Sequence, residues 1–352
     1  MKKILVILLT LALVGCSNQT DDKKNEENNA SNEQIKVAIV LSTGGLGDKN
    51  FNDMSYAGLE RAKEELNIEF DYIESQSATD YEPAYRQFAD SGEYDLIIGL
   101  ASDQIDALKA VSLDYPEQKF SLIDATLELT NVSSISTKWS EQTFLSGVYA
   151  GLGTLSDMEY ANDDNVVGVI LGADFPNLQE GTVGFEAGVR YVNPDATVLT
   201  SVVGDFSDAN KAKEMAVSMY TQGADFIQHL AGASGLGVFA AANENNKYVF
   251  GVGSNQNYLY PDNIVATSIR NVDDMVYNQV KQIVDGTRVE GLIIEGLKEG
   301  AVGYSAEQSN IVAPENIVNA ISDIETKIKN GELVPCGNRE ELEEWLANNQ
   351  YN

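Results

Sequence analysis

The regular alternation of short apolar runs with amphipathic stretches constrains the fold of this chain more than any other feature of its sequence. The apolar runs are KVAIVL, EFDYIE, YDLIIGL, KFSLID and NVSSIST, then NVVGVIL, ATVLTSVV, ADFIQHL, KYVFGVG and IVATSI. Helical patterns separate them, for example over residues 53–66, 81–91 and 209–222. Strands that alternate with helices predict parallel sheets covered by helices on both faces. We therefore predict an α/β protein with two doubly wound parallel-sheet lobes.

The two groups of runs give the expected lobe boundaries. Residues 35–155, completed by about 288–352, are predicted to form the first lobe, and residues 156–287 the second. The pattern over 140–155 has the small residues of a closely packed helix, and the loop DMEYANDD after it is the expected first passage between lobes. The segment GLIIEGLKEGAVGY and a terminal helix over 314–330 have no sheet of their own, so we expect them to return to the first lobe. A multi-crossing hinge follows, with the ligand between the lobes, outside the carboxyl ends of the strands.

The N-terminal residues have the pattern of an export signal. Residues 1–16, MKKILVILLTLALVGC, combine Lys2 and Lys3 with an apolar core too short to span a bilayer as a mature helix. The ending LVGC is typical of a bacterial lipobox, so Cys16 is the predicted lipidation site; the alternative is an ordinary signal peptide that happens to contain a cysteine. Residues 17–34 are polar and predict a disordered tether. We expect a lipid-anchored protein on the extracytoplasmic face of the cell membrane.

Composition argues against several classes of function. The net charge is −31, and without Lys2 and Lys3 the chain has 21 basic and 54 acidic residues, so nucleic acid and anionic lipid are poor partners. His229 is the single histidine, which argues against a multi-histidine metal site and a Cys–His nucleophile pair. We expect His229 to be packed or to line a ligand site, Cys336 to be inert packing, and the protein to need no metal or cofactor.

A glycine-rich loop stands between the first strand and the first helix, in KVAIVLSTGGLGDKNFND, residues 36–53. It lacks the third glycine of a dinucleotide fingerprint and the Gly-Lys-Ser/Thr of a P-loop. Asp48, Asn50 and Asn52 instead suit a neutral polar ligand with N–H and O–H groups. A second interpretation stays open, in which Asp48 or Asn52 caps the helix.

Seven ordered segments resemble the basic membrane protein (Bmp) family, which includes purine nucleoside receptor lipoproteins of ABC importers. They are GDKNFNDMSYAGL, DLIIGLASDQIDAL, FSLIDA, FLSGVYAG, GFEAGV, HLAGASGLGV and VFGVGSNQ. The resemblance covers nearly the whole chain after residue 34. It implies the type I periplasmic-binding-protein fold and a ligand held between the lobes by aromatic rings and carboxylates.

The resemblance also implies particular ligand-binding residues. In the first lobe they are Asp48, Phe51, Asn52 and Asp124, and in the second Gly232, Ser234, Gly253 and Arg270. Phe51 is expected to stack on a planar ring, the alternative being burial under the first helix. Asp124 is expected to contact the ligand, the alternative being a capping role.

Three positions in the second lobe depart from the family pattern. Gly181 stands where an aromatic residue is usual, five residues after Pro176. Gly253 replaces the acidic residue of GVDSDQ, which in the family would hold ribose hydroxyls, and Arg270 stands where lysine is common. Candidate substitutes for the lost groups are Asn255, Asn257 and Tyr258 for the acid, and Phe175 and Trp139 for the ring.

These observations predict a membrane-anchored, monomeric solute-binding lipoprotein that captures a nucleoside, a purine one above all, or a related heterocycle for an ABC permease. Alternatives are the same fold binding a flavin, a free base or another small polar solute, or acting as a sensor. An enzymatic alternative is a nucleoside hydrolase that uses Asp48 and Asp124 as a carboxylate pair. We expect no enzymatic activity.

Overall fold

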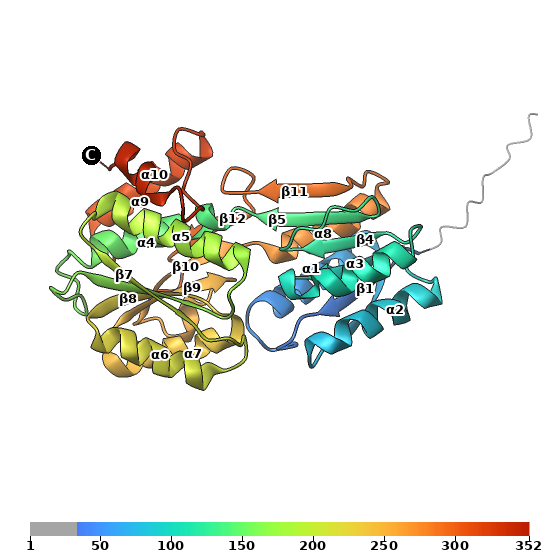
Figure 1. The fold of residues 1–352 in the computed structure, drawn as a ribbon, viewed down its shortest axis with the longest axis horizontal. Coiled ribbons are helices and arrows are strands. Elements are labelled where there is room, and N and C mark those ends of the chain that lie inside the picture. The colour runs from blue at the N-terminus through green and yellow to red at the C-terminus, as the bar shows by residue number, and fades with distance from the viewer. Residues whose placement is uncertain (1–33, 352) are drawn as a thin grey trace, which may run out of the picture. The chain divides into compact units, whose positions relative to one another are not determined.

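The computed structural model describes residues 34–351 of the chain, which form two six-stranded sheets (Figure 1). The first sheet contains, in spatial order, β11 (Gly291–Glu295), β5 (Val132–Thr137), β4 (Phe120–Ile123), β3 (Leu96–Leu100), β1 (Lys36–Leu41) and β2 (Glu69–Glu74). The second contains β12 (Val302–Ser305), β10 (Ile264–Arg270), β9 (Tyr248–Gly253), β8 (Ala224–Leu230), β6 (Val166–Leu171) and β7 (Thr197–Val202). Strand β12 is antiparallel to β10, and the other pairs are parallel. All ten predicted strands are confirmed, as is the α/β fold with two parallel-sheet lobes.

Helices cover both faces of the first sheet. Helices α1 (Phe51–Leu66) and α8 (Val272–Val284) pack on one face, where Leu59 and Val276 join the core formed by β1 and β3. Helices α2 (Tyr81–Ser91) and α3 (Ile105–Asp114) pack on the other. Strands β3 and β4 are buried along their whole length, as expected for central strands of a parallel sheet.

The second sheet is covered in the same way. Helices α4 (Trp139–Gly153), α5 (Pro176–Val192) and α9 (Glu315–Lys329) share a hydrophobic core with one face. Helices α6 (Ala209–Thr221) and α7 (Gly235–Asn245) share a core with the other. Helix α10 (Leu342–Asn348) lies beside α5, and its Leu342 enters the same core as α9.

The predicted lobe boundaries need correction. The chain passes from the first sheet to the second directly after β5, returns after β10, and passes again between β11 and β12. Helix α4, predicted in the first lobe, therefore belongs to the second, and α8, predicted in the second, belongs to the first. Of the C-terminal segment 288–352, β11 completes the first sheet, whereas β12, α9 and α10 join the second lobe.

Glycines at the α4–α5 crossing explain why α4 belongs to the second lobe. A Cβ on Gly147 of α4 would lie 2.1 Å from the carbonyl oxygen of Phe185, and a Cβ on Gly188 of α5 would lie 2.2 Å from that of Phe144. The two helices thus approach backbone to backbone at reciprocal positions. The closely packed helix predicted over 140–155 is confirmed as α4, which ends at Gly153, and its partner is α5.

The remaining sequence predictions concern isolated residues and the N-terminus. His229 is fully buried, with its ring edge-on to Phe239, and burial lowers its pKa to about 4, so it is a packed neutral side chain. Cys336 is buried and unbonded to another cysteine among the described residues. Residues 34–351 include no helix with the length and apolarity needed to cross a membrane. The predictions for Cys16 and for residues 17–33 lie outside the described residues.

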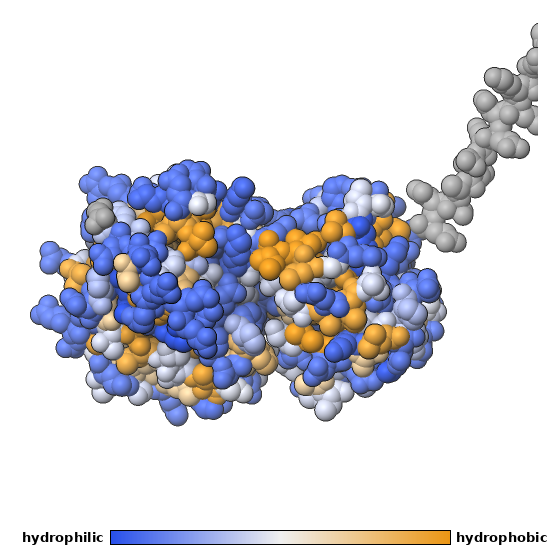
Figure 2. Space-filling model, turned by 45° about the horizontal axis from the view of Figure 1, so that its top comes forward, coloured by the Kyte–Doolittle hydropathy of each residue, from blue (hydrophilic) through white to orange (hydrophobic). Residues whose placement is uncertain are grey.

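Figure 2 shows a largely hydrophilic surface with separate apolar groups; Ile294 of the edge strand β11 is one exposed apolar residue.

Gly188→Ala should destabilise the protein by about 3 kcal/mol or more, because the added methyl meets backbone atoms that cannot move without separating the helices. Urea unfolding measures the change. Ala57→Leu, on the exposed side of α1, adds a larger group and should stay within about 0.5 kcal/mol of wild type. Equal stability of the two variants would contradict the close crossing.

Candidate ligand-binding site

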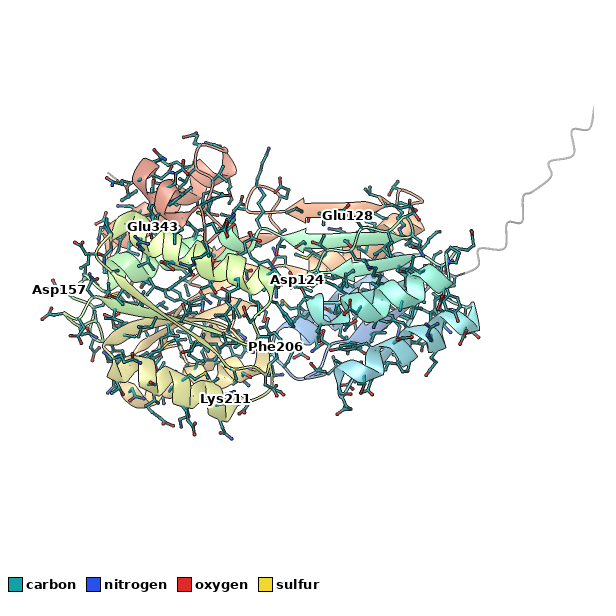
Figure 3. The ribbon with its side chains drawn as sticks, viewed as in Figure 1. Asp124, Glu128, Asp157, Phe206, Lys211 and Glu343 are labelled. Carbon is teal, nitrogen blue, oxygen red and sulfur yellow. The ribbon has the colours of Figure 1, made fainter. Side chains whose placement is uncertain are left out.

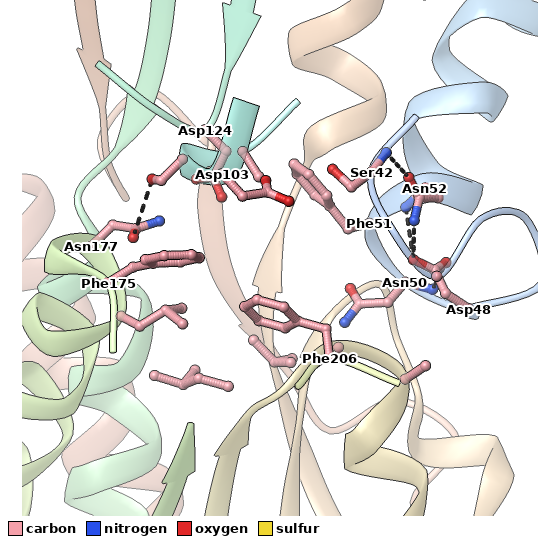
Figure 4. Close-up of a pocket in the computed structure, with 18 of the residues that line it drawn as sticks. Ser42, Asp48, Asn50, Phe51, Asn52, Asp103, Asp124, Phe175, Asn177 and Phe206 are labelled. Carbon is pink, nitrogen blue, oxygen red and sulfur yellow. Dashed lines mark hydrogen bonds between the residues drawn. The ribbon is translucent and has the colours of Figure 1, made fainter. Parts of the chain in front are cut away.

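A cavity lies between the lobes at the carboxyl ends of the strands, where an α/β fold of this kind places its ligand (Figures 3 and 4). It encloses about 750 Å³ of empty space, including space open to solvent. Its lining comes from both lobes: Ser42, Thr43, Gly44, Asp48, Asn50, Phe51, Asn52, Ala101, Ser102, Asp103, Asp124, Trp139, Phe175, Asn177, Leu178, Phe206, Leu230, Gly232, Ala233, Val252 and Arg270. The size suits a small organic molecule.

The glycine-rich loop shapes one side of the cavity through Asp48. The Asp48 carboxylate accepts hydrogen bonds from the backbone N–H groups of Asn50 and Asn52, each at 2.9 Å, and of Asp53 at 3.2 Å. Burial raises the pKa of Asp48, and these backbone donors oppose that rise. The Asn52 side chain donates to Asp48 and accepts from the N–H of Ser42 at 2.9 Å. Both residues line the cavity, yet their visible contacts hold the loop and the start of α1.

Four aromatic side chains line the cavity: Phe51, Trp139, Phe175 and Phe206. Phe51 is the first residue of α1 and is half-buried, and Figure 4 shows its ring facing the cavity. On the opposite lobe Phe175 and Phe206 stack on each other with ring centroids 6.2 Å apart. Aromatic surface on two sides suits a planar ligand.

A buried ion pair joins the two lobes at the cavity. Asp124 follows β4 and Arg270 ends β10, and their side chains meet at 2.6 Å with 4% and 6% exposure. The other Asp124 oxygen accepts from the Trp139 indole N–H at 3.1 Å, and the Arg270 guanidinium lies 4.1 Å from the Trp139 ring centroid. Burial raises the pKa of Asp124 to about 6, although the positive charge of Arg270 opposes the shift. Asp124 also has a left-handed backbone, φ 64°, a conformation found at functional sites.

The structure brings six of the eight predicted binding residues together around the cavity. These are Asp48, Phe51, Asn52, Asp124, Gly232 and Arg270. Ser234 is not among the lining residues; it is fully buried, and its hydroxyl donates to the carbonyl of Asp205 at 2.8 Å. Its backbone N–H donates to the carbonyl of Phe206 at 2.8 Å, so Ser234 holds the loop that carries Phe206.

Gly253, also predicted to bind the ligand, is not among the residues that line the cavity. Its φ is +86°, and a Cβ there would lie 1.9 Å from Oδ1 of Asn50. The Asn50 side chain from the other lobe thus occupies the space that a side chain at position 253 would need. The substitution Gly253→Asp would therefore strain the backbone and displace Asn50, so it is no simple way to restore a family carboxylate.

Of the five candidate substitutes for the missing family groups, two line the cavity and three do not. Trp139 and Phe175 both line the cavity, and the side chain of Trp139 lies 3.3 Å from where a Cβ of Gly181 would be. Asn255 and Asn257 instead donate to the backbone carbonyl of Glu307. Tyr258 is 51% exposed and is not among the lining residues.

Sequence reasoning missed Asp103, Phe206, Asn177 and the role of Asn50. Asp103 follows β3 just as Asp124 follows β4, so the rule that ligands bind at strand ends could have found it. Phe206 follows β7 by the same rule. Nothing in the sequence indicates that Asn50 packs on Gly253, because the contact joins residues of different lobes. Residues 34–351 hold no cluster of His, Cys, Asp and Glu suited to a metal ion.

Comparison with known proteins agrees with a ligand-binding cavity between two lobes. Residues 35–337 match the family model Bmp, described as ABC transporter substrate-binding protein PnrA-like. The chain belongs to the Bmp family. Among relatives of this Bmp protein, an uncharacterised lipoprotein of Pyrococcus abyssi is 31% identical, over 94% of this chain and 90% of its own. Basic membrane protein A of Borreliella afzelii is 30% identical, over 88% and 94% of the two chains.

A solved structure agrees with this assignment. An ABC transporter solute-binding protein of Aeropyrum pernix K1 superposes on the Bmp protein with a TM-score of 0.77 and 27% identity, over 89% of this chain and 98% of its own. Fold and family together identify a solute-binding protein of the periplasmic-binding-protein type.

Removing one member of the buried pair should be costly. Arg270→Met leaves the Asp124 carboxylate buried without its cation, and should lower the free energy of unfolding by about 3–5 kcal/mol. Combining it with Asp124→Asn should cost less than the sum of the single changes, with a coupling of about 1–3 kcal/mol in a double-mutant cycle.

Arg86→Met is the matched control, since Arg86 forms exposed ion pairs with Glu82 and Asp114. Its unfolding free energy should stay close to that of wild type. Additive effects at positions 124 and 270 would show that the ion pair does not contribute as described.

Proposed function

We propose that this protein captures a nucleoside, purine nucleosides above all, or a related planar heterocycle, and delivers it to an ABC permease. One observation carries the proposal: a cavity between the lobes of a Bmp-family chain is lined by aromatic rings on both sides and by a small number of polar groups. A planar heterocycle has ring faces for Phe51 and Phe206 and polar edges for the remaining groups.

Transport requires that the ligand favour one arrangement of the lobes. Besides the Asp124–Arg270 pair, the lobes meet beside the cavity through hydrogen bonds such as the Ser254 hydroxyl donating to the Lys49 carbonyl at 3.1 Å and the Ser102 hydroxyl to Asn177 Oδ1 at 3.5 Å. A ligand that contacts both lobes adds binding energy only when they are together. We therefore propose that binding stabilises closure and that the permease recognises the closed form.

A hydrolytic function finds no support in the carboxylates that the sequence offered for it. Asp48 is occupied by backbone N–H donors, and Asp124 by Arg270 and Trp139. A general acid or nucleophile needs a free oxygen directed at the substrate. Binding without catalysis is the function that we propose for this site.

Isothermal titration against purine and pyrimidine nucleosides, their free bases and riboflavin tests the ligand class. Phe51→Ala should weaken binding of the best ligand by about 1–3 kcal/mol, because stacking and apolar burial are both lost. The control Phe70→Ala removes a half-buried ring outside the cavity and should leave affinity unchanged. No heat with any compound would contradict the ligand class, and normal binding by Phe51→Ala would make Phe51 a core residue only.

Membrane attachment is proposed to depend on the lipid on Cys16. Cys16→Ala should move the protein from the membrane fraction to the soluble fraction, because the described residues include no helix long and apolar enough to span a bilayer. Fractionation with a high-salt wash measures this, and circular dichroism checks that the fold is intact. A variant that stays with the membrane after the wash would contradict lipid anchoring.

A further inference from the structure

Three carboxylates line the cavity, and two of them already have hydrogen-bond partners on both oxygens. Asp48 receives backbone and side-chain N–H donors from the start of α1. Asp124 receives the Arg270 guanidinium and the Trp139 N–H on its two oxygens. Neither carboxylate has an oxygen without a hydrogen-bond partner, whereas the third carboxylate, Asp103, has one.

Asp103 is held in place by a relay of hydrogen bonds. The backbone N–H of Thr43 donates to the Tyr81 hydroxyl at 3.0 Å, and that hydroxyl donates to Asp103 Oδ2 at 2.5 Å. Tyr81 is fully buried, so the relay fixes the carboxylate from behind. Ala101, two residues earlier, has φ 64° and turns the chain from β3 into the short 3-10 helix η2 (Ser102–Gln104) that carries Asp103.

The other oxygen of Asp103 has no partner. Its Oδ1 is buried and makes no hydrogen bond within the described structure. Arg270 is the single cation among the residues that line the cavity, and it is engaged by Asp124. Asp103 and Phe51 both line the cavity (Figure 4), so the carboxylate and the aromatic ring belong to the same site. Burial raises the pKa of Asp103, as expected for a carboxylate with one unsatisfied oxygen.

We propose that Asp103 is the specificity-determining carboxylate of this site and that its Oδ1 accepts a hydrogen bond from an N–H group on the edge of the ligand ring. This inference rests on the proposed function and names the edge chemistry of the ligand. A ring whose edge presents only acceptors or methyl groups would leave Oδ1 buried and unpaired, which is unfavourable. Asp124, the residue expected from the family resemblance to contact the ligand, instead serves to hold Arg270 across the lobes.

Nucleoside pairs that differ only by methylation of an N–H group test the proposal by isothermal titration. The probes are guanosine with 1-methylguanosine, adenosine with N6,N6-dimethyladenosine, uridine with 3-methyluridine, and cytidine with N4,N4-dimethylcytidine. Wild type should prefer the unmethylated member of the pair it binds by about tenfold or more. Asp103→Ala should weaken that unmethylated nucleoside by about tenfold to a hundredfold and reduce the preference towards unity.

Two variants serve as checks. Asp106→Ala removes an exposed carboxylate at the start of α3 and should leave both affinities unchanged. Asp103→Asn keeps an oxygen for the Tyr81 hydroxyl, so if Asp103→Ala fails to fold, the Asn variant should still lose part of the preference.

The outcomes separate the two proposals. Binding by wild type with an unchanged preference in either Asp103 variant overturns the role of Asp103 and leaves the proposed function standing. No binding of any nucleoside, free base or riboflavin by wild type overturns both, because the proposed edge contact then has no ligand of the proposed class.

Discussion

The buried pair of Asp124 and Arg270 is the interaction on which the site depends. It joins the end of β4 in one lobe to the end of β10 in the other at 2.6 Å, in a position where both side chains are almost wholly withdrawn from solvent. Burying either charge without the other is costly, so each side chain is stable in its buried position only when the other is present. The pair therefore fixes how the strand ends face each other, and it stacks Arg270 on Trp139 at the cavity wall.

This arrangement changes what the cavity can recognise. The Asp124 carboxylate is paired with Arg270, and the space beside Gly253 is filled by Asn50 from the other lobe. The aromatic surface is kept and extended by Phe175 and Phe206. Polar recognition accordingly falls to groups with free capacity, of which Asp103 is the clearest. A Bmp-family scaffold can thus keep its fold and its stacking surface while the groups that contact the ligand edges move to new positions.

The sequence predicted the strands, six of its eight predicted binding residues line the cavity, and its errors have a common cause. Buried parallel strands are continuous apolar runs, and strand ends meet at one edge of a sheet, so Phe51 and Asp124 could be placed without coordinates. The assignment of helix α4 to the first lobe was wrong because the reciprocal contacts of Gly147 and Gly188, which tie α4 to α5, depend on two helices meeting in space. The contact between Gly253 and Asn50 could not be predicted for the same reason, since the two residues are about two hundred positions apart in the sequence.

A crystal structure of the protein with a bound nucleoside would show directly how the cavity recognises its ligand. We expect a ring stacked against Phe51, an edge N–H within hydrogen-bonding distance of Asp103 Oδ1, and Asp124 still paired with Arg270. A ligand that binds Asp124 with Arg270 turned away, and leaves Asp103 without a contact, would contradict this expectation.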